Sequence, residues 1–477
     1  MSEGHDAIVV GGGHNGLVAA CYLARAGQRV LVVEALDRAG GGARTEEVVA
    51  GFRFDLHSAA HNIINMTAIP DELELAAAGL RYDQMDPFSI AVFADGRRVR
   101  FHRSVESTVA SIAEHDPVEA DAYRHFVEVG DHLVTAMLPA IRGDGALRDL
   151  PRRLAAVARV MRGGFMERSR DLLGPYESLL QRWLPSELTR APVAAFAAHA
   201  GVGPTVPGGA IYAFWQAAYH RFGQWHGHGG AQNLTDALLT RAAAWGVAVR
   251  TGTPVERIVT AGGRVRGVRV GGEELWAPVV LAATDARQAG LELLDPPLAG
   301  KVGADLAATR RGNVVQALVH VATDRLPPYA DARPGDHAGL QSYVERLGDL
   351  SDAWVRADAG ELPDPLPLYA FTTSAIDDTL APPGQHTVYL ACPAAPAVLR
   401  SGWEASRQAF VDGCIAEVER HAPGFESSVI DAVAWTPDLM MAGQAWPGAH
   451  PMHLDIALDQ LGPFRPTPAL GDHRTPV

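Results

Sequence analysis

The stretch DAIVVGGGHNG, residues 6–16, decides the fold that this sequence predicts. Residues 6–10 read as a short buried strand, and Gly11, Gly13 and Gly16 then form the spacing G-x-G-x-x-G at the start of an apolar helix. A second apolar run follows the helix and completes a strand–turn–helix–strand unit. In this context the glycine spacing indicates a dinucleotide site, and the alternative is a glycine-rich loop of a βαβ unit that binds nothing.

Each glycine of the pattern has its own physical task. The first permits the tight turn, the second lets the backbone approach a pyrophosphate, and the third lets helix and strand pack closely. His14 and Asn15 begin the helix, whose free N–H groups and partial positive charge favour phosphates. Glu34 and Ala35 follow the second apolar run, where a carboxylate can accept hydrogen bonds from both ribose hydroxyls.

A second glycine cluster, RAGGGART at residues 38–45, follows directly. A simple NAD domain does not need a glycine doublet at this place, so the cluster favours FAD over NAD. With GFRFD at residues 51–55, the stretch resembles the superfamily of FAD-dependent phytoene desaturases, carotenoid isomerases and β-carotene ketolases, whose broader relatives are flavin amine oxidases. Amine oxidases usually carry arginine after the doublet, where this chain has Gly42, and the difference favours the carotenoid branch.

The resemblance implies an α/β fold with a Rossmann-like, two-dinucleotide-binding FAD domain, a second α+β substrate domain and an inserted helical region. It also implies that FAD is the cofactor and that the substrate is an extended apolar, carotenoid-like or polyene-like molecule, which loses hydride or is isomerised. The residues expected to hold FAD are Gly11, Gly13, His14, Asn15, Gly16, Glu34, Ala35, Gly41, Gly42, Ala43, Arg44, Thr45 and, through its backbone, Val255.

The predicted domains alternate along the chain. We expect the FAD-binding domain in residues 1–68 and 229–296, and a substrate-binding helical insertion in residues 69–228. The sheet of the substrate domain is expected in residues 297–440, and a return toward the FAD domain in residues 441–477.

Local patterns predict individual elements within these domains. Residues 89–102 alternate in polarity around a central Ala-Asp-Gly turn and predict a hairpin. Residues 279–283 predict another buried strand of the FAD sheet, and residues 403–421 predict a long helix.

The chain stops at Val477, where the resembling proteins continue with an apolar strand, a glycine-rich turn and a last helix. That piece closes the FAD sheet in the family, so its loss would leave an unpaired sheet edge and one helix dipole fewer at the flavin. Three alternatives follow: the sequence is a fragment, a partner completes the FAD site, or the site has degenerated.

Composition limits the class of protein. The formal net charge of −14 argues against a general nucleic-acid binder. Cys21, Cys392 and Cys414 form neither a disulfide framework nor a metal spacing, and the first residues do not read as a signal peptide. No apolar run approaches the roughly 18 residues that a membrane span requires, so we expect a cytoplasmic protein.

Two histidines follow the glycine-rich region in LHSAAH, residues 56–61. The resemblance places this segment beside the flavin, so His57 is the candidate catalytic residue, as a proton acceptor or as a group that orients the flavin. The alternative is a structural histidine held by hydrogen bonds, which we favour for His61. No metal site is expected, because no third ligand accompanies this pair.

The stretch HRFGQWHGHGG, residues 220–230, combines histidines with aromatic side chains just before the expected return to the FAD domain. The aromatic residues either line an apolar substrate cavity or belong to the core, and the three histidines could also hold zinc. The aromatic residues concerned are Tyr212, Phe214, Trp215, Tyr219, Phe222 and Trp225, and the histidines are His220, His226 and His228.

Residues 142–170 are rich in arginine although the chain as a whole is acidic. Apolar residues stand between the arginines, a pattern typical of a helix at a membrane surface, through which an apolar substrate could enter. The alternative is a solvated helix whose arginines pair with acids elsewhere. The arginines are Arg142, Arg148, Arg152, Arg153, Arg159, Arg162, Arg168 and Arg170.

The sequence therefore favours an FAD-dependent oxidoreductase, a desaturase, dehydrogenase or isomerase of an apolar substrate. One alternative is an amine-oxidase-like enzyme that acts on a smaller substrate. The other is a non-catalytic or partner-dependent protein with a flavin-binding fold, which the position of Val477 suggests.

Overall fold

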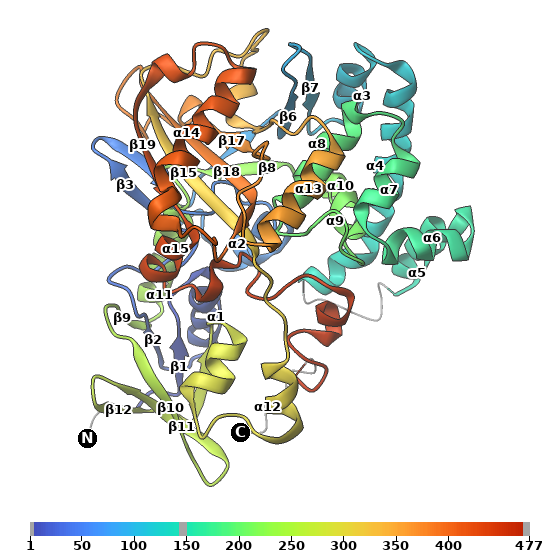
Figure 1. Cartoon of the computed structure of the whole chain (residues 1–477). Helices are drawn as coiled ribbons and strands as arrows, with labels where there is room; N and C mark the ends of the chain where they lie inside the picture. The colour runs from blue at the N-terminus through green and yellow to red at the C-terminus, as the bar shows by residue number, and fades with distance from the viewer. Residues whose placement is uncertain (1–3, 143–149, 471–477) are drawn as a thin grey trace.

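Two sheets organise the chain in the computed structural model, which describes residues 4–142 and 150–470 (Figure 1). The smaller sheet has four parallel strands in the order β13-β1-β2-β9, and the larger has seven strands. The predicted α/β fold class is confirmed. The predicted domain boundaries stay predictions. β6 and β7 of the expected insertion lie in the same sheet as strands of the expected substrate domain.

The parallel sheet consists of β1 (Ala7–Val10), β2 (Val30–Val33), β9 (Ala248–Arg250) and β13 (Val279–Ala282). β1 lies between β2 and β13. It therefore pairs with one strand that follows it closely in the sequence and with another that lies far along the chain. Within residues 4–142 and 150–470, β13 pairs with β1 alone, and Val279 is 51 % exposed. β13 is therefore an edge strand of this sheet in the described part of the chain.

Both faces of this sheet are covered. Helices α1 (His14–Arg25) and α11 (Gln232–Ala244) pack on one face, where Val9 and Val32 contact Leu17 and Leu238. A second four-stranded sheet, antiparallel except for the parallel pair of β10 and β14, covers the other face, where Ile8 packs near Val268. Burial on both faces explains why β1 and β2 are apolar throughout instead of alternating. The covering strands are β10 (Val255–Ala261), β11 (Arg264–Val270), β12 (Glu273–Trp276) and β14 (Leu294–Asp295).

The seven-stranded sheet has the order β19-β15-β18-β17-β16-β6-β7. The predicted hairpin is confirmed as β6 and β7, and the predicted helix is α14 (Trp403–His421), which packs on one face of this sheet. The strands are β6 (Ser89–Val92), β7 (Arg98–Phe101), β15 (Val314–Thr323), β16 (Leu340–Ser342), β17 (Tyr369–Phe371), β18 (His386–Pro396) and β19 (Val429–Trp435).

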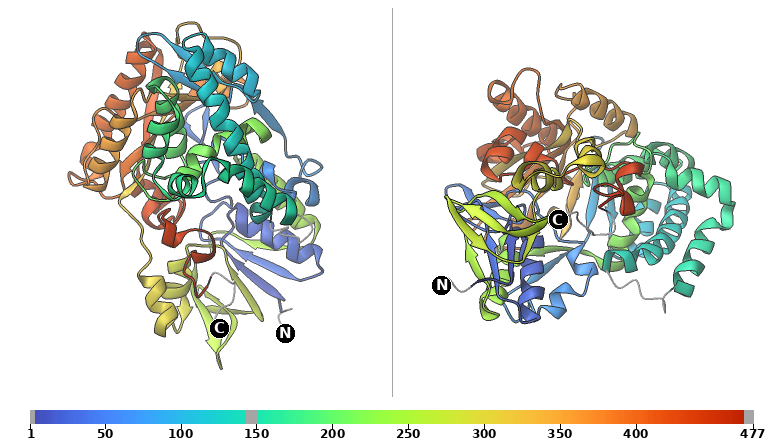
Figure 2. Two further views of the ribbon diagram at one scale, coloured as in Figure 1. Left: turned by 90° about the vertical axis from the view of Figure 1, so that its right-hand side faces the viewer. Right: turned by 90° about the horizontal axis from the view of Figure 1, so that it is seen from below.

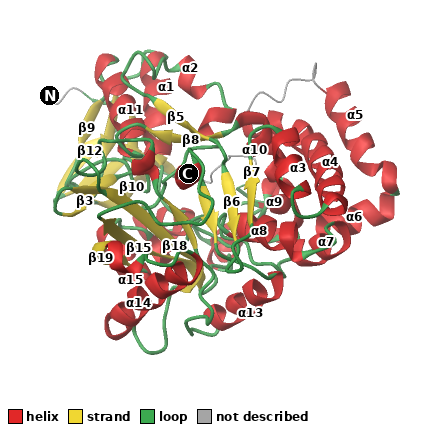
Figure 3. Ribbon diagram, turned by 90° about the horizontal axis from the view of Figure 1, so that it is seen from above, coloured by secondary structure: helices red, strands yellow, loops and turns green. Residues whose placement is uncertain are grey.

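Helices cover the other face of the large sheet and extend beyond it (Figure 3). They include most of the predicted insertion, whose proline and glycine residues separate one helix from the next. The helices are α3 (Val105–Ala113), α4 (Pro117–Arg142), α5 (Leu150–Val160), α6 (Phe165–Leu173), α7 (Tyr176–Trp183), α8 (Glu187–Ala198), α9 (Ala210–Phe214), α10 (Gln216–Phe222) and α13 (Leu347–Asp358).

Shorter elements connect these layers. β3 pairs with β4, which follows it closely in the sequence, and β5 pairs with β8, which lies far along the chain. The residues after α15 run between the parallel sheet and the helical region, as the red segment shows in Figures 1 and 2. The bounds are β3 (Thr45–Val49), β4 (Phe52–Asp55), β5 (Tyr82–Met85), β8 (Gln224–Gly227), α2 (Ile69–Glu72), α12 (Gly300–Ala307) and α15 (Pro437–Gly443).

Membrane-spanning length was tested on the helices of the described residues. None of them combines the length and the apolar character that crossing a bilayer would require.

Candidate active site

The turn between β1 and α1 requires two of its glycines for purely steric reasons. Gly11 has φ +103°, and a Cβ atom there would lie 2.8 Å from the carbonyl oxygen of Ala283. A Cβ atom on Gly16 would lie 2.1 Å from the carbonyl oxygen of Gly11, so α1 could not approach β1 as it does. At Gly13 a Cβ atom would meet only the Cα atom of Gly41, at an ordinary 3.9 Å. The fold therefore needs Gly11 and Gly16, while Gly13 leaves an open approach to the backbone.

The N-terminus of α1 is available to an anion. Gly13 caps the helix without a side-chain hydrogen bond, and the first turn holds no acidic residue, so the first N–H groups are free. His14 and Asn15 are both exposed there. The surrounding protein nevertheless desolvates the His14 ring and, with the charge of His453, lowers its pKa.

Glu34 closes the glycine turn at the end of β2. Its Oε2 atom accepts a hydrogen bond of 2.6 Å from the N–H of Gly12, and its Oε1 atom accepts one of 2.9 Å from Leu36. The side chain is buried beside the turn, while Ala35 is exposed. The N–H of Thr253 donates to the Glu34 carbonyl at 2.8 Å, and this contact brings the start of β10 close to the turn. Val255 lies two residues further on in that strand and is half-buried.

The second glycine segment lies directly against the first. Gly40 donates to the Gly12 carbonyl at 2.9 Å and forms an isolated parallel bridge with Gly13. A Cβ atom on Gly41, where φ is +57°, would lie 3.3 Å from the Cα atom of Gly13. Gly42 follows, and its carbonyl accepts from the N–H of Ser58 at 3.2 Å. The two glycine segments predicted from the sequence are thus neighbours, and His57 lies behind them.

The residues after the doublet anchor it to α11. The Thr45 hydroxyl donates to the Asp55 carboxylate at 2.6 Å and accepts from the N–H of Gln232 at 3.0 Å. Asp55 also accepts from the N–H of Ala231 at 2.7 Å, and burial raises its pKa. The side chain of Thr45 is therefore engaged within the protein, which leaves only its backbone for a ligand.

Ala43 and Arg44 are held in the same way. Ala43 is buried, and its carbonyl accepts from the hydroxyl of Thr235 at 3.0 Å. Arg44 is buried, pairs with Glu46, and donates to the carbonyl of Gly443 at 3.5 Å, while its Nε atom has no partner. Arg44 thus connects the second glycine segment to the residues that follow α15.

In residues 56–61, one buried ring nitrogen has no hydrogen-bond partner among the described residues, and it belongs to His57. That atom is Nε2. The ring lies edge-on to Trp446, with centroids 4.6 Å apart and an interplanar angle of 73°, and Tyr389 donates to the His57 carbonyl at 2.8 Å. Burial lowers the pKa of His57 to about 4, so the ring is neutral near pH 7. A neutral imidazole with a free nitrogen can hold a hydrogen bond or a proton for a ligand.

His61 differs from His57 in that one of its ring nitrogens has a hydrogen-bond partner. Its Nδ1 atom lies 2.9 Å from the Tyr82 hydroxyl, and its backbone N–H donates to Trp225 at 2.7 Å. Burial lowers its pKa to about 3. These contacts agree with the structural role that we favoured for His61.

Among the described residues, several further buried polar atoms near the two glycine segments and the end of α15 have no hydrogen-bond partner. Trp446 contacts His57, Gln444 follows the Gly443 carbonyl that Arg44 reaches, and Thr284 lies against Gly11. Buried polar atoms in proteins are nearly always hydrogen-bonded, so a group of unpaired ones indicates a place where a polar ligand binds. The unpaired atoms are Arg44 Nε, His57 Nε2, Thr284 Oγ1, Trp435 Nε1, Gln444 Oε1 and Nε2, and Trp446 Nε1.

The sequence predicted that residues 441–477 return toward the FAD domain, but it marked none of them as site residues. Arg311 connects them to the parallel sheet: it donates to Asp285 at 2.5 Å and to the carbonyl of His453 at 2.8 Å. The Trp446 and His453 rings lie 6.2 Å apart. No local pattern marks these residues as part of a site, because their role depends on contacts with distant β13 and β15.

The histidines of residues 220–230 have separate partners. His220 Nε2 lies 2.8 Å from the Tyr123 hydroxyl, His226 Nε2 lies 3.0 Å from Asp377, and His228 Nδ1 lies 2.8 Å from Asp83. A zinc site made of these three residues is therefore not formed. His228 does approach Asp377 and Asp378 closely, but hydrogen bonds from His226, Gly229 and Thr379 already occupy both oxygens of Asp377.

The aromatic side chains of the same region belong mainly to the core. Phe214 stacks on Phe126 with centroids 4.7 Å apart, and Tyr219 meets Phe196 edge-on at 4.5 Å. Phe214 and Tyr219 both belong to the hydrophobic core, so the structure favours the core alternative for them, and their place in a substrate cavity stays a prediction. The others, half-buried beside this core or in β8, are Tyr212, Trp215, Phe222 and Trp225.

A buried ion pair fastens this region to the large sheet. The side chains of His226 and Asp377 are fully buried, and the pair lies next to Asp55. Burial alone would raise the pKa of Asp377, but hydrogen bonds from His226, Thr379 and Gly229 outweigh burial and lower it. Burial alone would lower the pKa of His226, but its bond to Asp377 and the charges of Asp55 and Asp377 outweigh burial and raise it.

The pair predicts how stability depends on pH. The lowered pKa of Asp377 stabilises the fold above its usual value of 3.8, and this contribution is lost as pH falls through the folded pKa. The raised pKa of His226 stabilises the fold below 6.5, and that contribution is lost as pH rises through the folded pKa. We expect Asp377→Asn to reduce the free energy of unfolding by about 3–5 kcal/mol between these values, because it leaves a buried histidine without its partner.

Urea unfolding followed by circular dichroism across that pH range measures this effect. Asp378→Asn is the matched control, because Asp378 is the exposed neighbour and should change stability by less than about 0.5 kcal/mol. Equal stability of Asp377→Asn and the unmodified chain would contradict the assignment.

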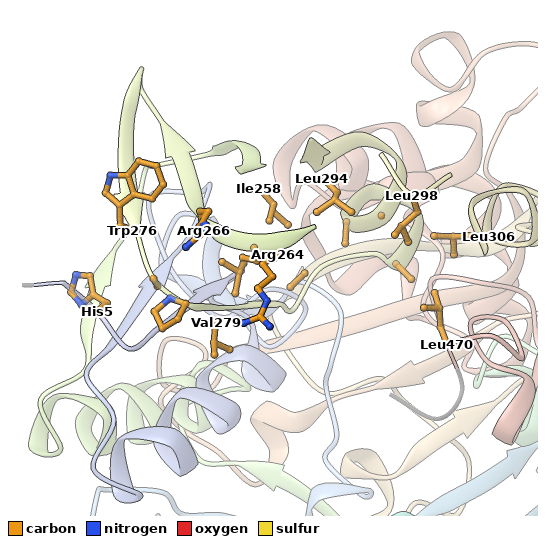
Figure 4. Close-up of a pocket in the computed structure, with 18 of the residues that line it drawn as sticks. His5, Ile258, Arg264, Arg266, Trp276, Val279, Leu294, Leu298, Leu306 and Leu470 are labelled. Atoms are coloured by element: carbon orange, nitrogen blue, oxygen red, sulfur yellow. The ribbon is translucent and has the colours of Figure 1, made fainter. Parts of the chain in front are cut away.

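A large apolar cavity lies elsewhere, along the free edge of β13 (Figure 4). Its volume is about 930 Å³, and its walls include Ile258, Leu294, Leu298 and Trp276, with Arg264 at one side. None of the residues predicted to hold FAD lines it. The cavity is therefore separate from the glycine segments, Glu34 and His57.

Comparison with known proteins agrees with this geometry. The model of the family described as flavin-containing amine oxidoreductase matches residues 16–463. This chain belongs to that family. The resemblance found in the sequence is thereby confirmed at the level of the superfamily that includes flavin amine oxidases and carotenoid desaturases.

Individual members of the flavin-containing amine oxidoreductase superfamily match nearly the whole chain. Pyridine nucleotide-disulfide oxidoreductase domain-containing protein 2 of Rattus norvegicus is 30% identical over 99% of this chain and 88% of its own length. Phytoene dehydrogenase of Streptomyces griseus is 27% identical over 96% of this chain and 87% of its own. A crystal structure of an oxidoreductase from Methanosarcina mazei shares the fold, with a TM-score of 0.59 and 15% identity over 90% of this chain and 87% of that one.

Proposed function

We propose that this flavin-dependent oxidoreductase binds FAD across its two glycine segments and takes hydride from, or isomerises, an extended apolar substrate. The observation that carries the proposal is the row of buried, unpaired polar atoms beside those segments, from Thr284 to Trp446. A dinucleotide with a polar flavin ring would provide partners for such atoms on two sides of the turn.

The residues fit FAD in distinct ways. The open backbone at Gly13 and the free N-terminus of α1 suit the pyrophosphate, and Glu34 suits the ribose hydroxyls. Gly41 and Gly42 let the second segment pass close to the remainder of the cofactor. The backbone at Val255 lies near Glu34, because Thr253 donates to the Glu34 carbonyl. FAD, when bound, supplies the hydride acceptor of the reaction.

His57 is the candidate catalytic residue of this proposal. It is neutral near pH 7 and presents Nε2 without a partner, so it can accept a proton from a substrate or orient the ligand by a hydrogen bond. Tyr389 fixes the His57 backbone, and Trp446 fixes the ring, so the nitrogen is held in one direction. Trp446 also adds an apolar surface beside the proposed reaction site.

Two observations support an apolar, carotenoid-like substrate over a small amine. The chain carries Gly42 where amine oxidases usually carry arginine. Phytoene dehydrogenase is among the relatives that match almost the full chain. Release of hydrogen peroxide with amines would favour the amine-oxidase alternative, and a folded, colourless chain would favour the non-catalytic or partner-dependent one.

The experiment begins with the visible spectrum of the purified chain before and after FAD addition and desalting. We expect retained flavin absorbance, followed by anaerobic bleaching when an apolar polyene such as phytoene is added in detergent micelles. His57→Gln should retain the flavin but slow the bleaching by about 100-fold, because one proton-transferring group is lost.

The matched control for that variant is His125→Gln, which changes an exposed histidine on α4. It should leave the bleaching rate unchanged. Bleaching by His57→Gln at the unmodified rate would exclude His57 from the reaction, and bleaching by amines but not by polyenes would contradict the proposed substrate class.

A further inference from the structure

Helices α5 (Leu150–Val160) and α6 (Phe165–Leu173) lie at the periphery of the molecule. They project from the helical region on the side far from the parallel sheet and the seven-stranded sheet, as Figure 1 and the right panel of Figure 2 show. α5 contacts α4, and α6 contacts α7 and α9.

The outer surface of these helices is unusually apolar. Phe165 and Met166 are 68 % and 78 % exposed, and Leu154 and Leu173 are each more than half exposed. Val157 lies three residues after Leu154, so the two share one face of α5. Single exposed apolar residues are common, but several large ones on two adjoining helices indicate a contact surface.

The same surface is strongly basic. Residues 150–173 hold six arginines and only two acidic residues, in a chain whose formal net charge is −14. One of the two acids, Asp171, is buried and pairs with Arg182. Arg152, Arg159 and Arg162 are exposed, and none of them forms an ion pair within residues 4–142 and 150–470. The alternative of a solvated helix with fully paired arginines therefore holds for Arg168 and Arg170 alone, which lie near Asp171.

Some of the residues of the predicted membrane stretch cannot contribute to this argument. Arg148 lies outside the described residues, as do the side chains of Arg142 and Arg153. The surface is therefore defined by Leu154, Val157, Phe165, Met166 and Leu173 with Arg152, Arg159, Arg162 and Arg170.

We propose that this α5–α6 surface docks on membranes that contain anionic phospholipids. The apolar side chains enter the boundary between headgroups and acyl chains, and the arginines contact the phosphates. Charge complementarity decides the occupant, because a basic surface attracts an anionic bilayer. A second copy fits less well, because a two-fold contact would place the same arginines opposite one another.

Vesicle co-sedimentation tests the proposal on the full chain, with no requirement for bound FAD. Vesicles of phosphatidylcholine with phosphatidylglycerol are compared with vesicles of phosphatidylcholine alone, at about 0.1 M and about 1 M salt, where the Debye length falls from about 10 Å to about 3 Å. We expect binding to the anionic vesicles at the lower salt, and at least a tenfold loss at the higher salt or without phosphatidylglycerol.

Two double variants separate the apolar and the charged contributions. Phe165→Ser with Met166→Ser, and Arg159→Glu with Arg162→Glu, should each reduce binding to anionic vesicles at least tenfold while circular dichroism and thermal unfolding stay unchanged. Val355→Ser with Arg356→Glu is the matched control, since these neighbours on α13 are also exposed. It should bind like the unmodified chain.

Three results would overturn the proposal. The first is no binding to anionic vesicles, and the second is equal binding by the two α5–α6 variants and the α13 control. The third is a dimer that Phe165→Ser with Met166→Ser converts to a monomer without any effect on vesicle binding, which would assign the apolar residues to a second copy.

Discussion

Glu34→Arg is expected to abolish FAD retention while the chain stays folded. In the structure the carboxylate accepts hydrogen bonds from Gly12 and Leu36 at the corner of the glycine turn. Arginine has no acceptor and would place a positive charge and a longer side chain where the ribose hydroxyls are expected to bind. We expect the flavin-to-protein absorbance ratio after desalting to fall at least tenfold.

Two further variants make this result specific. Glu34→Gln keeps one acceptor oxygen for Gly12 or Leu36 and should lose less FAD affinity than Glu34→Arg. Glu256→Arg makes the same charge change at an exposed position of β10 and should retain FAD fully. Unchanged flavin content in Glu34→Arg would rule out the ribose assignment.

The glycines of the first turn should separate folding from cofactor binding. Gly16→Ala places a Cβ atom 2.1 Å from the carbonyl oxygen of Gly11, which is a backbone atom and cannot rotate away as a side chain could. Since α1 must then move away from β1, we expect a loss of about 3 kcal/mol in the free energy of unfolding, or no soluble protein. Gly13→Ala meets only an ordinary contact in the protein, at 3.9 Å, so the fold should persist while FAD affinity falls tenfold or more.

Urea unfolding and FAD titration of both variants measure the two effects. Gly348→Ala is the control, because its Cβ atom would meet nothing within 4 Å and its backbone lies within α13. It should match the unmodified chain in both measurements. If Gly13→Ala bound FAD normally, the pyrophosphate would not lie against this backbone.

Local sequence patterns predicted the elements that depend on neighbouring residues. The strand–turn–helix unit at residues 6–33 and helix α14 follow from apolar periodicity and glycine spacing alone. The second glycine segment was also predicted, because its composition is unusual directly after an acidic residue. The structure adds that it touches the first segment through Gly13 and Gly40.

The sequence could not predict contacts between distant parts of the chain. The pairing of β5 with β8 and the buried pair of His226 with Asp377 depend on the path of the insertion, which no local pattern encodes. The engagement of the Thr45 side chain with Asp55, and the place of Trp446 beside His57, arise in the same way. The histidines of residues 220–230 suggested a zinc site, but the rings of His220, His226 and His228 form hydrogen bonds with three different residues.

The position of β1 between β2 and β13 has a consequence for biosynthesis. β2 leaves the ribosome soon after β1, whereas Val279, which pairs with Ala7, follows only after the whole helical insertion. The nascent chain must therefore keep an incomplete hydrophobic sheet open while more than half of the protein is translated. Such long-range closure is entropically costly and slow, and it exposes strand edges that chaperones recognise. Cofactor capture should consequently be a late event in maturation, and the yield of coloured protein should respond to translation speed and chaperone supply.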